Sequence, residues 1–418
     1  MKKLFIFISL FVFNLSLLTR ASAQGIPVIT SWMVNTTGLT GYSGITANVQ
    51  TDQFDSNNVY ISCSDIPSYT IGPWPSDPNI PKNQNFVFKI TRTPVQNTGT
   101  LDSVGLGQIC LFSDGVVGYS ASDAMTYNND GVWHRNAYYF EGVSFDACLG
   151  HPDPNGAYHQ HVNPKCLYND QDSTQHSPLI GYAFDGFPVY GAYGYASALN
   201  ASSGIKRMTP SYQARTNMVN RDTLPNGTIL ASAKYGPAVS ASYPLGDFME
   251  DYTYVASSGD LDDHNGRFCV TPEYPSGIYA YFITIDSKQN PVFPYILGYT
   301  YFGTVQAGNT PPTGGHNTIP SGTKVYTPTG INEVNQGIKF QFEPNPVTDF
   351  AYIYLDPASE SNITATLYNP EGQLLKTYTN WHPGINYKLD MSAYPAGIYL
   401  LHLQTENTSV VQKIVKVK

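Results

Sequence analysis

Short hydrophobic runs separated by turn-forming residues recur along the chain from residue 26 to residue 302. Alternation and a high content of β-branched and aromatic residues favour strands in these runs, whereas sustained helical periodicity is scarce. Asn-Asp-Gly at 129–131 and Asn-Gly at 265–266 favour hairpin turns. We therefore predict a β-rich domain over residues 24–304, with strands that include residues 59–61, 86–90 and 279–283.

The pattern changes after residue 304. Residues 305–337 show no apolar period and contain Thr-Pro-Pro-Thr-Gly-Gly at 310–315, which predicts a linker. Hydrophobic and polar residues alternate again from residue 338 onwards, in runs mostly bounded by Gly, Pro, Asn or Asp. About 80 residues with evenly spaced short strands fit a small β-sandwich over 338–418. Its predicted strands include residues 351–355, 365–368, 398–403 and 410–415.

The N-terminus has the layout of a secretory signal peptide. Two lysines precede an apolar run over residues 4–18, and Ala-Ser-Ala at 21–23 forms a small-residue cleavage site. The apolar run is shorter than the roughly 20 residues that a membrane span needs, so we expect removal of residues 1–23 rather than anchoring. No cysteine follows the cleavage site, which argues against a lipoprotein.

Composition agrees with an exported β protein. Charged residues make up only 13% of the chain, whereas Tyr (32), Gly (36) and Pro (30) are plentiful, as suits twisted strands and tight turns. Residues 1–23 carry three of the 22 basic residues and none of the 31 acidic ones, so the mature chain has a net charge of −12. This charge makes nucleic acid a poor partner. No other segment approaches the length of a membrane span.

Five cysteines in an exported chain are able to form disulfides, because the compartment is oxidising. We pair Cys148 with Cys166, which bracket the segment richest in histidine and would close a loop worth roughly 3 kcal/mol of unfolded-state entropy. The sequence leaves the pairing of Cys63, Cys110 and Cys269 open, and the odd number requires at least one free or intermolecular thiol.

Four of the nine histidines fall within residues 151–176. If residues 158–162 form a strand, His159 and His161 project to one face and could ligate one divalent ion. Zinc and copper sites commonly take three imidazoles, so His151 or His176 could complete the set. The alternative is that these histidines are ordinary hydrogen-bonded groups among the many tyrosines.

Two acidic positions allow similar alternatives. Asp185 could act as a general base or orient a histidine, but an aspartate that caps its own turn before Gly186 is the preferred interpretation. The acidic stretch 260–266 does not fit a calcium loop, because Gly266 falls one position late, and a turn at Asn265-Gly266 is favoured. Signatures of serine hydrolases, P-loop proteins and zinc proteases are missing from the sequence.

Short sequence blocks follow one another along the C-terminal unit. They are Glu-Pro-Asn-Pro at 343–346, Leu-Tyr-Asn-Pro-Glu-Gly-Gln at 367–373, Leu-Asp-Met-Ser at 389–392, Pro-Ala-Gly-Ile-Tyr at 395–399 and Lys-Ile-Val-Lys at 413–416. In their order and spacing these blocks resemble the type A sorting domain of the type IX secretion system. The resemblance implies Sec export, passage through the outer membrane by the type IX translocon, and removal of the domain with surface attachment or release. An ordinary sandwich domain retained for binding is the alternative.

A second set of motifs lies in the segment from about residue 56 to residue 303. They are Gly-His-Pro at 150–152, Gly-Ala-Tyr-His-Gln-His at 156–161, the run 176–191, Asp-Tyr-Thr-Tyr at 251–254, Gly-Asp-Leu-Asp at 259–262, Asn-Gly-Arg-Phe at 265–268 and Thr-Pro-Glu-Tyr-Pro at 271–275. This segment resembles the YHYH family. The family is named for a Tyr-His-Tyr-His run, and this chain departs from it at Gln160, which keeps both histidines but removes an aromatic ring from the opposite face. The resemblance identifies candidate positions but implies no particular reaction.

We therefore expect a mainly β protein, with a large irregular β-rich domain, a linker and a small C-terminal β-sandwich, exported to the cell surface or outside. Its first functional hypothesis is a metalloprotein that binds zinc or copper, in which the ion could serve an enzyme by polarising a substrate or activating water. The second is a non-catalytic module that binds a glycan or a protein through Tyr-rich loops. A third is that the histidines are purely structural.

Overall fold

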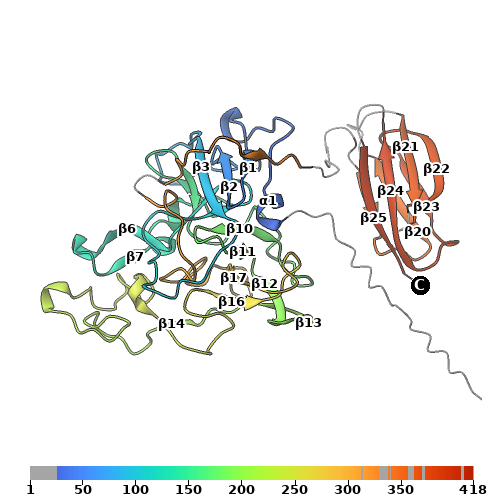
Figure 1. Cartoon of the computed structure of the whole chain (residues 1–418). Coiled ribbons are helices and arrows are strands. Elements are labelled where there is room, and N and C mark those ends of the chain that lie inside the picture. The colour runs from blue at the N-terminus through green and yellow to red at the C-terminus, as the bar shows by residue number, and fades with distance from the viewer. Residues whose placement is uncertain are drawn as a thin grey trace, which may run out of the picture. The chain divides into compact units, whose positions relative to one another are not determined.

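Strands form most of the regular structure in the computed structural model, which describes residues 26–311, 314–328, 338, 340–355, 362–369, 372–405 and 409–417. The chain divides into two units, Met1–Pro328 and Thr329–Lys418, each with its own hydrophobic core. Figure 1 shows both as sets of strands linked by long loops. The expected signal peptide lies outside the described residues.

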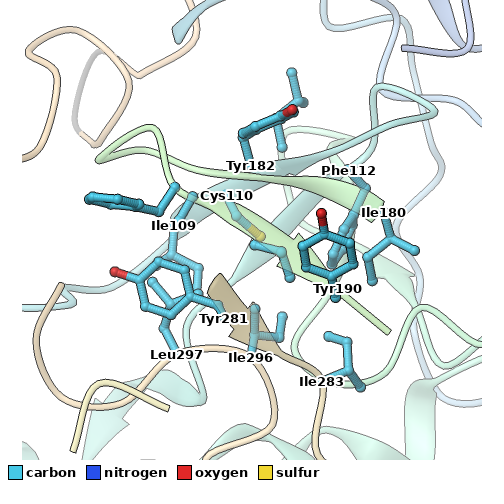
Figure 2. Close-up of a cluster of buried hydrophobic side chains, with 14 of the residues drawn as sticks. Ile109, Cys110, Phe112, Ile180, Tyr182, Tyr190, Tyr281, Ile283, Ile296 and Leu297 are labelled. Carbon is cyan, nitrogen blue, oxygen red and sulfur yellow. The ribbon is translucent and has the colours of Figure 1, made fainter. Parts of the chain in front are cut away.

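An eight-stranded sheet runs through the first unit in the order β16-β17-β11-β10-β4-β5-β9-β8. Its central strands β4 and β10 are buried at every position, so both faces of the sheet are covered there. Figure 2 shows side chains from β4, β10, β11 and β17 packed together in this core. The strands are β4 (Gln108–Phe112), β5 (Val117–Tyr119), β8 (His151–Pro152), β9 (Tyr158–Gln160), β10 (Leu179–Ala183), β11 (Pro188–Tyr190), β16 (Gly266–Cys269) and β17 (Ile278–Phe282).

A second sheet of the first unit has the order β18-β1-β2-β3 and comprises β1 (Val49–Phe54), β2 (Asn58–Cys63), β3 (Phe86–Thr91) and β18 (Lys324–Val325). β3 alternates strictly between buried and half-buried residues, as its sequence predicts. β1 departs from alternation through a bulge between Val49 and Thr51, which places Asp52 on the buried side together with Val49.

Three two-stranded sheets and several short helices complete the described part of the first unit. The predicted turn at 129–131 joins β6 to β7, whereas Asn265 lies in a tight turn that leads into β16. The paired strands are β6 (Ser122–Thr126) with β7 (His134–Asn136), β12 (Tyr193–Ser197) with β13 (Asn200–Arg207), and β14 (Tyr212–Ala214) with β15 (Tyr252–Tyr254). The helices are α1 (Pro27–Thr30), α2 (Ala137–Phe140) and the 3-10 turns η1 (Tyr42–Gly44), η2 (Tyr127–Asn129), η3 (Gly142–Ser144), η4 (Ser232–Lys234) and η5 (Met249–Asp251).

The described part of the predicted linker up to residue 328 packs against the first unit. Asn309 is fully buried and exchanges hydrogen bonds with the backbone of Lys89 on β3, and β18 pairs with the edge of β1. The Gly- and Pro-rich composition had suggested a free spacer. Its backbone groups instead bond to strands that are far away in sequence, which composition alone does not reveal.

The second unit consists of a three-stranded sheet, β19-β20-β23, and a four-stranded sheet, β22-β21-β24-β25, which share one core. Alternating burial along β20 and β24 explains why their sequences predicted strands with one face inward. The strands are β19 (Phe340–Glu343), β20 (Phe350–Leu355), β21 (Ile363–Tyr368), β22 (Leu374–Trp381), β23 (Asn386–Asp390), β24 (Gly397–Gln404) and β25 (Ser409–Lys416).

Candidate metal centre

Three histidines and a glutamate converge at one end of the eight-stranded sheet. His159 lies on β9, His161 follows that strand directly, and His151 on β8 pairs opposite His159. Glu141 lies between α2 and η3. One ligand atom from each of these four side chains can be chosen so that all four atoms lie within 4.8 Å of one another.

Glycine allows β8 to approach β9 closely enough for this convergence. A Cβ atom on Gly150, which directly precedes β8, would lie 2.5 Å from the Tyr158 hydroxyl and 2.9 Å from the His159 carbonyl oxygen. Any larger residue would push the strands apart. Glu141 is placed by the turn that follows α2, a helix capped by the buried Asn136 side chain.

The two histidines of the β9 segment have defined tautomers. His159 Nδ1 lies 3.1 Å from the Ala157 carbonyl oxygen, and His161 Nδ1 lies 2.6 Å from the Ser120 carbonyl oxygen. A carbonyl oxygen only accepts, so both Nδ1 atoms carry the proton and donate it. In the neutral form of each ring Nε2 then presents a lone pair, and the two Nε2 atoms face each other at 3.0 Å.

His151 has the same tautomer by a similar argument. The Ser144 hydroxyl lies 2.6 Å from the Glu141 carbonyl oxygen, to which it donates its single proton. It must then accept from His151 Nδ1, 2.8 Å away, and the Asp77 carboxylate lies 3.4 Å from the same nitrogen. In the neutral ring His151 Nε2 is thus an acceptor, and this buried atom lies 3.2 Å from another acceptor, Glu141 Oε2.

The centre therefore brings together three imidazole lone pairs and one carboxylate oxygen. Glu141 Oε2 lies 3.0 Å from His161 Nε2 and 3.2 Å from His151 Nε2. Four ligands at about 2.1 Å from one tetrahedral ion are about 3.4 Å apart, slightly more than these separations. Each imidazole also donates its other ring proton to an oxygen, which is the arrangement that orients metal-binding histidines.

Burial of the three histidine side chains also favours metal binding. The side chains of His151 and His161 are 10% and 4% exposed and that of Glu141 is 24% exposed, so Glu141 forms the solvent side of the group. Burial, followed by the neighbouring histidines His161 and His151, lowers the pKa of His159 well below its usual range, which favours the neutral ligand form. The Tyr119 ring stacks on His159 with centroids 3.8 Å apart and closes one side.

The Cys148–Cys166 disulfide is present, with a Cα–Cα distance of 5.1 Å, as the sequence predicted. Gln160, which replaces the expected tyrosine, points away from the histidines, and its amide nitrogen lies 3.4 Å from the carbonyl oxygen of Cys148. This Gln160 contact ties the loop that leads into His151 to the opposite face of β9. The other three cysteines are unpaired and buried: Cys63, Cys110 and Cys269.

The structure places the remaining predicted residues elsewhere. His176 is outside the four-residue group and packs against the rings of Tyr190 and Tyr195. Asp185 is fully buried and accepts hydrogen bonds from the Phe187 and Gly303 amides and the Tyr281 hydroxyl, so it ties a turn to neighbouring segments.

The acidic stretch at 260–266 is also a turn. Asp262 Oδ1 accepts the amide protons of His264 and Gly266, and both of its carboxylate oxygens receive the Tyr279 hydroxyl. The preference for a turn over a calcium loop is consistent with these contacts.

Glu141 was missed by the sequence interpretation. It lies ten residues before His151 in a stretch, Tyr-Tyr-Phe-Glu-Gly, that has no metal-ligand spacing. The sequence offers one hint, which is that a cluster of three histidines needs a fourth metal ligand. Acidic residues are too common in the chain for this hint to identify Glu141. The short α2–η3 turn, rather than a motif, brings Glu141 to the histidines.

Comparison with protein families assigns both units. Residues 87–294 match the model described as YHYH protein, a range that contains all four residues of the centre. The larger unit carries a YHYH domain. Residues 342–418 match the secretion system C-terminal sorting domain, which indicates export of the chain by the type IX machinery to the cell surface or outside. Among its described residues, no helix is long and apolar enough to span a membrane.

Other comparisons add little to this assignment. No curated protein matches the chain. Latent dimeric PorU from Porphyromonas gingivalis is 21% identical over 19% of this chain and 9% of its own length, with a TM-score of 0.16. PorZ of the same organism, a surface component of its type IX secretion system, is 11% identical over 89% of this chain and 52% of its own length, also with a TM-score of 0.16. The chain thus spans about half of PorZ or less than a tenth of PorU.

Proposed function

We propose that the YHYH domain is a surface-delivered metal-binding domain, in which Glu141, His151, His159 and His161 hold one divalent transition-metal ion. The observation that carries the proposal is the set of three Nε2 lone pairs directed at one another and at a carboxylate oxygen. Without a cation these acceptors repel one another in a buried space. A single ion satisfies all four at once.

Zinc is the ion that best suits this set. Three imidazole nitrogens and one carboxylate oxygen match the four-ligand sets that zinc prefers, whereas copper(II) favours square-planar geometry. Four protein ligands fill a tetrahedral shell, so the site is closed and the ion has a structural role. It would tie β8, the β9 segment and the turn after α2 to one another.

Metal content tests this proposal. We expect the purified mature protein to contain close to one equivalent of zinc by inductively coupled plasma mass spectrometry, and the His159→Ala/His161→Ala variant to contain none. His176→Ala is the matched control, because His176 lies in the same segment of the sequence but outside the group. Metal absent from folded wild-type protein after growth and purification with zinc would refute the site, and equal loss in the control would refute this choice of ligands.

We further propose that the chain enters the periplasm by the Sec route and loses residues 1–23 there. The apolar run at 4–18 and the Ala-Ser-Ala site support this step. The expected N-terminus of the exported protein is Gln24, measurable by N-terminal sequencing of protein from culture supernatant or the cell surface. Exported protein that still begins at Met1 would contradict the proposal.

A further inference from the structure

The Cys148–Cys166 disulfide closes the stretch of chain that carries three of the four proposed metal ligands. The two cysteines are 18 residues apart, and the ligands between them are His151, His159 and His161. Cys148 precedes the first of these histidines by three residues, and Cys166 follows the last by five. The bridge therefore confines the three histidines to one short covalent loop, in the folded and the unfolded chain alike.

Backbone pairing contributes little to holding the strand that carries His151. β8 comprises two residues and lies at the end of the eight-stranded sheet, where its described pairing is with β9. β9 in turn pairs with β5 at two positions. An edge with so few backbone hydrogen bonds opens easily. The position of His151 therefore depends on the loop that enters β8.

This loop keeps an unfavourable backbone conformation next to the bridge. Leu149 has a φ of 64°, in the left-handed region that a leucine rarely adopts. On either side of it, the amides of Cys148 and Gly150 donate to Asp146 Oδ1 at 2.9 and 3.2 Å. Such a conformation persists only where neighbouring contacts enforce it. Because the bridge fixes Cys148, its opening allows the loop to relax, and His151 moves with the loop.

The ligands themselves favour an open edge when no ion is bound. Three Nε2 lone pairs and the Glu141 carboxylate face one another, and the Nε2 atoms of His159 and His161 are 3.0 Å apart. The ion and the bridge thus stabilise the same closed arrangement of β8, β9 and the turn after α2. Two groups that favour one arrangement of a protein strengthen each other.

The bridge is accessible to a redox partner from one side. Cys166 is exposed, whereas Cys148 is buried. The other three cysteines are buried and unpaired: Cys63, Cys110 and Cys269. Thiol–disulfide exchange therefore reaches the bridge from the Cys166 side, and the bridge accounts for the disulfide redox state of the whole chain.

We propose that the Cys148–Cys166 disulfide controls the metal affinity of the centre, so that the oxidised chain holds the ion and the reduced chain releases it. This inference rests on the metal-binding function proposed above and concerns its regulation. Formation of the bridge transfers two electrons and two protons from the two thiols to the disulfide of a protein oxidant, which becomes a dithiol. Thiols stay reduced in the cytoplasm, whereas the periplasm is oxidising. The chain therefore takes up its ion after it has left the cytoplasm.

The coupling has a bounded size and acts in both directions. Closing a loop of this length corresponds to roughly a hundredfold in an equilibrium constant. We expect zinc to bind between about tenfold and about a hundredfold more tightly to the oxidised chain. Linkage then requires zinc to stabilise the bridge by the same factor. For a two-electron couple a tenfold change corresponds to about 30 mV, so zinc should lower the reduction potential of the bridge by about 30–60 mV.

Zinc affinity with and without the bridge is the first measurement. Cys148→Ser/Cys166→Ser removes the bridge and both thiols, and competition with a chromophoric chelator should give a zinc dissociation constant at least about tenfold above that of the oxidised mature protein. Lys165→Ser changes the exposed neighbour of Cys166 and should bind zinc as wild type does. Equal affinities of the double variant and wild type would overturn the coupling. Oxidised wild type that binds no zinc would instead refute the metal site itself.

The reduction potential tests the coupling in the wild-type protein, even if the serine variant fails to fold. The mature protein is equilibrated with reduced and oxidised thioredoxin, in saturating zinc or in EDTA, and free thiols are counted by alkylation and mass spectrometry. Zinc should lower the potential by about 30–60 mV in wild type and leave it unchanged in His159→Ala/His161→Ala. A wild-type potential that zinc leaves unchanged would contradict the proposal. So would a raised potential, because it would mean that zinc binds the free thiols.

Discussion

Removal of the metal ion from the Glu141–His151–His159–His161 centre is expected to lower the unfolding temperature of the YHYH domain by roughly 10 °C. An ion present at about a thousand times its dissociation constant contributes about 4 kcal/mol to stability. In a domain of this size each kcal/mol corresponds to about 2–4 °C. Differential scanning calorimetry with and without EDTA, followed by zinc addition to recover the lost stability, measures the effect.

The response to the chelator should depend on the ligands. The His159→Ala/His161→Ala variant is expected to unfold at a lower temperature than wild type and to show no further change with EDTA. His176→Ala should retain the full EDTA-dependent shift, because its side chain lies outside the group. An EDTA shift of the same size in the double variant would show that the stabilising ion is bound somewhere else.

Replacement of Asp52 with Asn is expected to stabilise the protein increasingly as pH rises. Asp52 is fully buried on β1, and neither carboxylate oxygen has a hydrogen-bond partner among the described residues. Burial raises the pKa of Asp52 to about 8, against about 4 in an unfolded chain. Between these values the folded state retains a proton that the unfolded state has released, so rising pH favours unfolding.

The asparagine side chain does not titrate. The free energy of unfolding of the variant therefore does not fall with rising pH through this position. Between pH 5 and pH 8 the stability difference between Asp52→Asn and wild type should grow by up to about 4 kcal/mol. Urea unfolding at both pH values measures it, and comparison at each pH cancels any pH dependence of metal binding. Asp263→Asn changes an exposed carboxylate and serves as the matched control. Parallel pH profiles of Asp52→Asn and wild type would contradict the assignment.

Strand positions were predictable because hydrophobic and polar residues alternate along a strand that has one buried face. The runs at 86–90 and 398–403 became β3 and β24 for this reason. The packing of residues 305–328 was not predictable, because Asn309 contacts β3 through hydrogen bonds across more than 200 residues of sequence. Such contacts leave no periodic pattern, so composition pointed to a spacer.

The candidate site was predictable only in part, for a similar reason. Strand geometry alone directs His159 and His161 to one face, whereas the sequence left open whether His151 or His176 joins them. Glu141 and His176 depend on tertiary packing. A turn after α2 brings Glu141 in, and aromatic residues on other strands hold His176 away from the group.

The pairing of β18 with β1 bears on where the sorting domain can be cut off. Lys324 and Val325 cover the edge of β1, and the Tyr326 amide donates to the Asp52 carbonyl oxygen. Proteolysis before these residues would leave an unpaired strand edge, which invites association between copies. A product that had lost the sorting domain would therefore keep the edge of β1 covered only if the cut fell after Tyr326.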